Sequence, residues 1–399
     1  MIGLFAVIAL VGGTVHPGDG PPVPDATVIV RDGKIAAIGP GLAVPAGAEV
    51  IDCRGKIITP GLIDAFTGLG LVDIDLVPAS NDTEARGPAI RAANRAVDNF
   101  NPDNPAIAIQ RAHGITTVLT APGGGIIAGQ AAVYSLVGDA PLRAPAAMVA
   151  RLGGVAHGAR GTALLALREV LDDARVYAKN KAAFEQNRLR KMAASRLDLE
   201  ALGPVVRGEV PLIVHVERRT DILATLRLGE EFGVKIIIAG GAEAWLAADA
   251  LAKARVPVIL DPSVDAPLDF DRLHSRADAA ALLAKAGVPI ALSTFATHQV
   301  RKLRQWAGNA VRAGLSHDDA LRAVTATPAA LYGLGDRGVI RAGAVADLVV
   351  WSGDPFELLT HAERVIIGGE AVPTRHRQTA LFERYRHLPA LVSPGGPDR

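Results

Sequence analysis

Beyond residue 60, short apolar stretches alternate with longer stretches of helical pattern, and this alternation constrains the fold more than any other feature of the sequence. The candidate strands are residues 61–64, 116–120, 146–150, 212–216, 235–239, 256–260 and 289–294. Strands that alternate with helices form parallel β/α units. No Gly-x-Gly-x-x-Gly turn follows an early strand, so the pattern predicts an α/β protein with a (β/α)8 barrel rather than an open doubly wound sheet.

Two of the predicted helices have clear ends. Helix 221–232 stops at Gly233, and helix 243–254 runs into Pro257. Between the barrel strands, residues 172–202 form a long, charged helical insertion. Its mixed charges favour a solvent-exposed helix, and a docking arm for a homo-oligomer is the alternative.

Both ends of the chain have β character. The N-terminal part contains turn-rich hairpin signals such as Asp32-Gly33, and residues 338–372 contain further short strands. We therefore predict that residues 1–58 and 336–375 form one small composite β-domain, that residues 59–335 form the barrel, and that residues 376–399 are a tail. The apolar residues 1–11 are interpreted as a first strand or as the remainder of a trimmed export signal, which leaves a cytoplasmic or periplasmic location open.

Composition narrows the classes of partner. Of 399 residues, 42 are Lys or Arg and 41 are Asp or Glu, so the net charge of +1 predicts neither a nucleic-acid nor a membrane partner. With 49% hydrophobic residues the chain has ample material for a deep core. Cys53 is the single cysteine, which excludes an internal disulfide and a thiolate metal cluster within one chain.

Four segments in a fixed order carry a family resemblance. They are Val11-Gly-Gly-Thr-Val-His16, Val30-Arg-Asp-Gly-Lys-Ile-Ala-Ala-Ile-Gly39, Thr59-Pro-Gly-Leu-Ile-Asp64 and Ala346-Asp-Leu-Val-Val350. Together they resemble the amidohydrolase superfamily, in its imidazolonepropionase-like branch. The resemblance implies a TIM-like barrel beside a composite β-domain, and metal-dependent hydrolysis of non-peptide or cyclic amide carbon–nitrogen bonds.

The same resemblance implies a set of metal ligands, and most of them are replaced. Phe66 and Gly68 stand where the family has a His-x-His pair, Gly240 stands at the sixth-strand His, and Ala296 at the eighth-strand Asp. His215, on the fifth strand, is the one retained ligand. A catalytic zinc usually has about three protein ligands. Two expectations for the cofactor therefore stay open: one divalent metal, with zinc as the candidate, or no metal.

His215 and Glu217 are the candidate catalytic residues. They lie two positions apart on a predicted strand, so both side chains point to the same face. One hypothesis is a weak metal site or a general base oriented by its neighbour. The other is a buried ion pair, with Arg218 or Arg219 nearby.

Four further residues are candidates for substrate binding, namely Gln130, Glu243, Thr294 and His298. They follow or end predicted barrel strands, where such barrels bind ligands. The glycine-rich run at residues 122–125 is interpreted as a flexible loop, with anion binding as the alternative. The remaining histidines singled out are interpreted as solvated surface residues: His113, His157, His274, His317 and His376.

Two functions stay open. The first is a divergent hydrolase of carbon–nitrogen bonds that uses His215 and Glu217. The second is a pseudoenzyme whose barrel binds a small molecule, or serves assembly, without hydrolysis.

We predict that the double substitution Phe66→His with Gly68→His confers no metal-dependent turnover, because Gly240 and Ala296 still supply no ligands. Amide hydrolysis assayed with added zinc or manganese checks this expectation. Substantial turnover by the double variant would show that the ligand count has missed donors.

Overall fold

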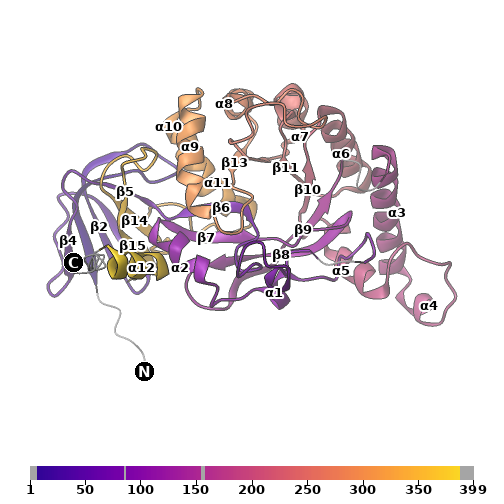
Figure 1. Ribbon diagram of the computed structural model, residues 1–399, viewed down its shortest axis with the longest axis horizontal. Coiled ribbons are helices and arrows are strands. Elements are labelled where there is room, and N and C mark those ends of the chain that lie inside the picture. Colours follow the sequence, from indigo (N-terminus) through magenta and orange to yellow (C-terminus); the bar gives the residue numbers. More distant parts are fainter. Residues whose placement is uncertain (1–6, 85–86, 154–157, 387–399) are drawn as a thin grey trace, which may run out of the picture.

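The structure is a computed structural model that describes residues 7–84, 87–153 and 158–386. It contains two sheets of eight strands each. Figure 1 shows the N-terminal strands, in indigo, and the C-terminal strands, in yellow, together at one end of the molecule, with the second sheet and its helices beside them. The predicted combination of a TIM-like barrel and a composite β-domain is confirmed.

The composite sheet is built from both ends of the chain. In spatial order the strands are β16 (Glu370–Ala371), β15 (Ala362–Ile367), β14 (Leu348–Trp351), β5 (Ile57–Pro60), β1 (Ile8–Val15), β2 (Val23–Arg31) and β3 (Lys34–Pro40), with β4 (Glu49–Asp52) against β1. The first strand of the chain, β1, pairs antiparallel with β2 and parallel with β4 and β5. The C-terminal strands extend the sheet from β5, to which β14 pairs antiparallel.

The barrel sheet follows the order of the sequence. Its strands are β6 (Leu62–Thr67), β7 (Ile115–Thr120), β8 (Ile127–Ser135), β9 (Pro141–Arg151), β10 (Leu212–Val216), β11 (Ile236–Gly240), β12 (Val258–Leu260) and β13 (Ile290–Leu292). Seven of these were predicted. The strand that the sequence pattern missed, β8, is antiparallel to both neighbours, so the barrel is not all-parallel as expected. The connection from β7 to β8 is too short for a helical crossover.

A buried carboxylate spans the seam between the first and last barrel strands. The hydrogen-bonded ladder runs from β6 to β13 and, in the described part of the chain, does not close between these two strands. Asp64 on β6 accepts hydrogen bonds from Ser293 Oγ at 2.5 Å and from Thr294 Oγ1 at 2.6 Å, just after β13. Tyr332 donates to the Ala65 carbonyl at 2.5 Å beside it. These contacts take the place of a ladder at the seam.

Side-chain alternation along the strands divides the barrel core. On β10, Ile213 packs in the barrel interior, whereas Val214 and Val216 pack against the surrounding helices. His215 follows Ile213 by two positions and therefore points inward as well. The predicted orientation of this residue follows directly from the period of the strand.

Helices flank the barrel sheet, and a few begin at a capping side chain, as the helix that starts at His317 does at Ser316. They are α1 (Ala96–Asn99), α2 (Pro105–Ala112), α3 (Arg160–Lys179), α4 (Lys181–Glu185), α5 (Arg196–Val206), α6 (Arg219–Phe232), α7 (Ala248–Ala254), α8 (Ala279–Lys285), α9 (Leu303–Arg312), α10 (His317–Ala323), α11 (Ala326–Leu331) and α12 (Arg377–Tyr385), with short 3-10 turns η1 (Pro78–Ser80), η2 (Ala244–Ala247) and η3 (Val300–Lys302). Helix α6 ends at Gly233, as predicted, in the left-handed conformation with φ of 56°. The helix predicted over 243–254 is divided into η2 and α7.

The predicted insertion at 172–202 is not one exposed helix. It includes the end of α3, all of α4 and the start of α5, and Figure 1 places α3 and α4 at the end of the molecule away from the composite sheet. Asp173 and Tyr177 of α3 are buried, so one face of this region packs against the barrel. Charge pattern alone missed this apolar face.

Among the described residues, no helix has both the length and the apolar character needed to cross a membrane. Residues 1–6 of the predicted first strand, His157 and residues 387–399 of the predicted tail lie outside the described ranges. The compartment stays a prediction.

Asp64→Asn tests the seam. Burial raises the pKa of Asp64 to about 6, against the hydrogen bonds from Ser293 and Thr294 that lower it. The unfolded chain releases this proton near pH 4 and the folded chain near pH 6, so the folded state binds more protons in between, and stability falls as pH rises through this window. An asparagine side chain at this position cannot titrate.

We therefore expect the free energy of unfolding of the natural protein, relative to Asp64→Asn, to fall by about 2 kcal/mol between roughly pH 4 and pH 6.5. Chemical denaturation of both proteins across this range measures the difference. Parallel pH curves would contradict the proposed titration of Asp64.

Candidate functional site

The candidate site lies at the mouth of the barrel, which is formed by the carboxyl ends of the strands and the loops that follow them. His215 on β10 and Phe295, which follows β13, each line two neighbouring cavities. One cavity, of about 90 Å³, extends toward Glu217, Asp261 and Arg272. The other, of about 220 Å³, extends past the ends of β6, β7 and β9. His215 thus lies at a strand end and lines both cavities, and its predicted role there stays a prediction.

His215 and Glu217 lie together, as their spacing indicates. The Nε2 atom of His215 is 3.3 Å from Glu217 Oε1. The Glu217 carboxylate also accepts hydrogen bonds from the Ala242 backbone N–H at 2.9 Å and from Arg272 Nη2 at 3.0 Å. The prediction that Arg218 or Arg219 pairs with Glu217 is wrong. The arginine that pairs with Glu217 is Arg272, which lies in the loop between β12 and α8.

These contacts fix the charge of Glu217. Burial by itself raises the pKa of Glu217, but the hydrogen bond and charge of His215, the Ala242 N–H and the charge of Arg272 together bring the pKa below its usual value. Glu217 is therefore ionised at neutral pH. In the neutral imidazole, an ionised carboxylate beside Nε2 favours the tautomer of His215 that carries its proton there, and in that tautomer Nδ1 has the lone pair.

An aromatic cluster fills the centre of the mouth. The rings of His215 and Phe295 are stacked with centroids 5.6 Å apart, and Phe66 lies 5.2 Å from Phe295 and 6.4 Å from His215. Phe295 has φ of 50°, a conformation that bulky residues adopt only when the surrounding structure imposes it. Phe66 and Phe295 therefore occupy the region where the resemblance implies metal-bound imidazoles.

Two glycines at implied ligand positions are closely covered. A Cβ on Gly240 would lie 2.6 Å from Glu217 Oε1, and the φ of Gly240 is +83°. A Cβ on Gly68 would lie 2.7 Å from Thr297 Cγ2. The space for side chains at these positions is already occupied, and at Gly240 it is occupied by the Glu217 carboxylate itself.

None of the four predicted substrate-binding residues is among the described residues that line the two cavities. Thr294 is buried in the seam with Asp64. Gln130 Nε2 donates to the Ala92 carbonyl at 3.1 Å, on the outer side of β8. His298 Nδ1 is 3.1 Å from Thr297 Oγ1. Among the described lining residues of the two cavities, Gln130 and His298 are absent.

Glu243 supports the mouth from behind. Its buried carboxylate accepts from the Arg219 backbone N–H at 2.9 Å, and one of its oxygens is 2.8 Å from His274 Nδ1. It thereby joins the loop after β10 to the loop after β12. Its position is structural, and its predicted contact with substrate stays a prediction.

Three residues of the mouth were missed by sequence reasoning. Arg272 lies in a loop without periodic pattern, so nothing in the sequence indicates that it reaches Glu217. Phe295 directly follows a predicted strand, and its position at a strand end is the one feature of the sequence that could have placed it at the mouth. Arg151 ends β9 and lines the larger cavity. The glycine-rich turn at 122–125 also contributes Gly123 and Gly124 to this cavity.

The mouth does not fit the metal that the resemblance implies. Within the described residues, His215 belongs to no group of three His, Cys, Asp or Glu side chains whose ligand atoms converge closely enough for one ion. A catalytic zinc needs about three protein ligands. The nearest carboxylate, that of Glu217, is already bonded to Ala242 and Arg272.

The fold and the mouth define a class: a TIM-like barrel joined to a composite β-domain, with a His–Glu pair at the carboxyl ends of the strands. The chain belongs to the amidohydrolase family. The solved structure of an amidohydrolase from Thermotoga maritima MSB8 is 30% identical in sequence, covers 92% of this chain and 100% of that chain, and has a TM-score of 0.84. The model of the Amidohydrolase family matches residues 284–373. The predicted resemblance is confirmed.

Curated relatives agree with this assignment. Amidohydrolase tasK of Hapsidospora irregularis is 25% identical over 394 residues, which is 86% of this chain and 39% of that protein. An imidazolonepropionase of Methylobacterium nodulans is 37% identical over 120 residues, or 26% of this chain and 30% of that protein. The chain thus spans about two fifths of tasK and a smaller share of the imidazolonepropionase.

We predict that Gly240→Ala destabilises the protein by about 2 to 5 kcal/mol, from left-handed strain of about 1 to 2 and overpacking against Glu217 of about 1 to 3. Gly233→Ala is the matched control, because its φ is +56° and a Cβ there would meet nothing within 4 Å. In a Glu217→Ala background the excess cost at Gly240 should shrink. Urea denaturation measures all of these variants, and equal costs at the two glycines would contradict the account of Gly240.

Proposed function

We propose that this chain is a small-molecule-binding member of the amidohydrolase family whose barrel mouth does not carry out the family's metal-dependent hydrolysis. The observation that carries the proposal is the content of the mouth. Phe66 and Phe295 pack against His215, and Glu217 fills the space beside Gly240. The chemistry of these side chains supports binding more directly than activation of water by a metal.

The cavities indicate the class of ligand. In the described structure, the Nε atom of Arg272 is buried and has no hydrogen-bond partner. Its contact with Asp269 Oδ2 is a looser ion pair at 3.9 Å, and the same guanidinium bonds to Glu217. A buried donor of this kind favours a ligand carboxylate or amide carbonyl in the smaller cavity. The rings of Phe66 and Phe295 offer an apolar surface in the larger one. A small amide or carboxylate with a planar apolar group fits both features.

A second candidate function is hydrolysis of a carbon–nitrogen bond without a metal. The contact between His215 Nε2 and Glu217 Oε1 favours it, because a carboxylate that holds one imidazole nitrogen leaves the other free to take a proton from water. The names of the relatives also support hydrolysis, since tasK is an amidohydrolase. In this function His215 acts as the base and Glu217 orients it.

Binding and turnover are tested together on the full chain with a chelator present. We expect at least one member of a panel of N-acyl amino acids and cyclic amides to bind, as measured by calorimetry, with no hydrolysis product by mass spectrometry. Arg272→Met should weaken that binding about 10- to 100-fold, the effect of one charge-assisted hydrogen bond. Arg276→Met is the control, because Arg276 lines the same cavity and is paired with Asp278 but, in the described part of the chain, has no buried nitrogen left without a hydrogen bond.

The remaining outcomes decide between the candidates. Hydrolysis with the chelator present that is lost in His215→Ala would favour the metal-independent hydrolase. Hydrolysis that requires added zinc or manganese would contradict the account of the mouth. Equal effects of the two arginine substitutions would remove Arg272 from the binding site.

A further inference from the structure

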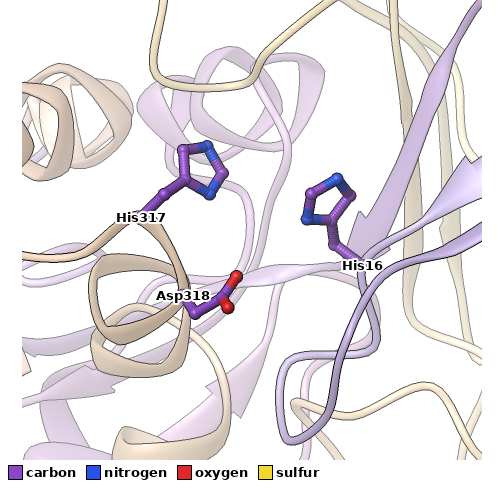
Figure 2. A group of neighbouring side chains, drawn as sticks. All are labelled: His16, His317 and Asp318. Carbon is purple, nitrogen blue, oxygen red and sulfur yellow. The ribbon is translucent and has the colours of Figure 1, made fainter.

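A second cluster of polar side chains lies away from the barrel mouth, where the composite β-domain meets the barrel. His16 follows β1, and His317 and Asp318 begin α10. One ligand atom from each lies within 4.8 Å of the other two. Figure 2 shows the two imidazoles facing one another, each with a ring nitrogen toward a common gap, and the Asp318 carboxylate projecting toward the same gap.

His317 is held in place by a carboxylate from a third segment. Its Nε2 atom is 3.0 Å from Asp354 Oδ1 and 3.1 Å from Oδ2, and Asp354 lies in the loop after β14. The backbone N–H of Phe356 fixes this carboxylate at 2.9 Å. In the neutral imidazole of His317, the contact with Asp354 keeps the proton on Nε2 and leaves the lone pair on Nδ1. A carboxylate behind an imidazole is the arrangement that orients metal-binding histidines in proteins.

His16 presents an unused nitrogen to the same gap. Its Nδ1 atom is buried and has no hydrogen-bond partner within the described structure. A buried, unpaired ring nitrogen needs a partner. The surface interpretation of His317 is corrected here too, because its ring is half-buried among His16, Asp354 and Phe356.

We propose that His16, His317 and Asp318 bind one divalent metal ion of the zinc type at the junction of the β-domain and the barrel, with Asp354 as a positioning residue for His317. Two imidazole nitrogens and one carboxylate oxygen form a donor set that suits zinc. Water completes the coordination, since Asp318 is exposed.

The geometry requires a small contraction. Zinc bonds of about 2.0 to 2.1 Å place tetrahedral ligand atoms about 3.4 Å apart. The ligand atoms here lie within 4.8 Å of one another, so rotation of the exposed Asp318 side chain and small ring movements bring them into range. The ion would then link β1 of the composite domain to α10 of the barrel, and through Asp354 to the loop after β14. Its effect is to stabilise the folded state by binding it selectively.

The test uses the full chain, stripped of metal with a chelator and returned to metal-free buffer. Titration with zinc alone, followed by calorimetry and elemental analysis, should give one ion per chain and a higher melting temperature. Asp318→Asn and His16→Gln should each abolish stoichiometric binding or weaken it at least tenfold. Asp354→Asn should weaken it about tenfold, the usual effect of losing an outer carboxylate. Cobalt in place of zinc should give visible absorption bands that the same substitutions remove.

Matched controls separate this site from other effects. Asp319→Asn removes the neighbouring charge on the same helix turn, and His361→Ala removes an exposed imidazole bonded to Ser352. Both should bind zinc as the natural chain does. His215→Ala should also retain the ion, so failure of this proposal and failure of the proposed function are distinguishable. Absence of zinc binding, or binding unchanged in both Asp318→Asn and His16→Gln, would overturn the proposal.

Discussion

The barrel depends on how its seam is closed. Its first and last strands share no ladder in the described structure, and the buried carboxylate of Asp64 spans them by accepting the hydroxyl groups of Ser293 and Thr294. A carboxylate can be buried only if such donors surround it, so the two chain segments must keep a fixed register. Phe66 and Phe295 each follow this link by one or two residues. The seam therefore sets where both rings enter the mouth.

At the mouth, a side chain from one strand fills the space that a side chain on the neighbouring strand would need. Glu217 reaches from the end of β10 into the space that a side chain at Gly240 would need, and the left-handed backbone of Gly240 favours glycine there. Arg272 and the Ala242 N–H hold the carboxylate in that position. The substitutions at the implied ligand positions therefore form one packed arrangement. A histidine reintroduced at Gly240 or Gly68 would meet an occupied site.

The two sheets are joined through segments that lie far apart in sequence. Pro60 ends β5 in the composite sheet, and Leu62 begins β6 of the barrel after a single intervening glycine. Trp351 Nε1 donates to Thr59 Oγ1 at 2.9 Å within this junction. His16, His317 and Asp354 lie at the same boundary, from the first strand, a barrel helix and a C-terminal loop. The family's structural likeness thus extends over both units, while the polar chemistry is distributed between the mouth and the junction.

The sequence by itself determined the parallel strands of the barrel, the composite β-domain, the common orientation of His215 and Glu217, and the end of α6 at Gly233. These follow from local periodicity, turn residues and the order of motifs. It missed the antiparallel β8, the buried face of α3 and the partner of Glu217. Only the tertiary structure decided that Arg272 reaches Glu217, that Asp64 spans the seam, and that His16 meets His317. Such contacts join residues separated by tens to hundreds of positions, and local pattern carries no information about which distant side chains share a space.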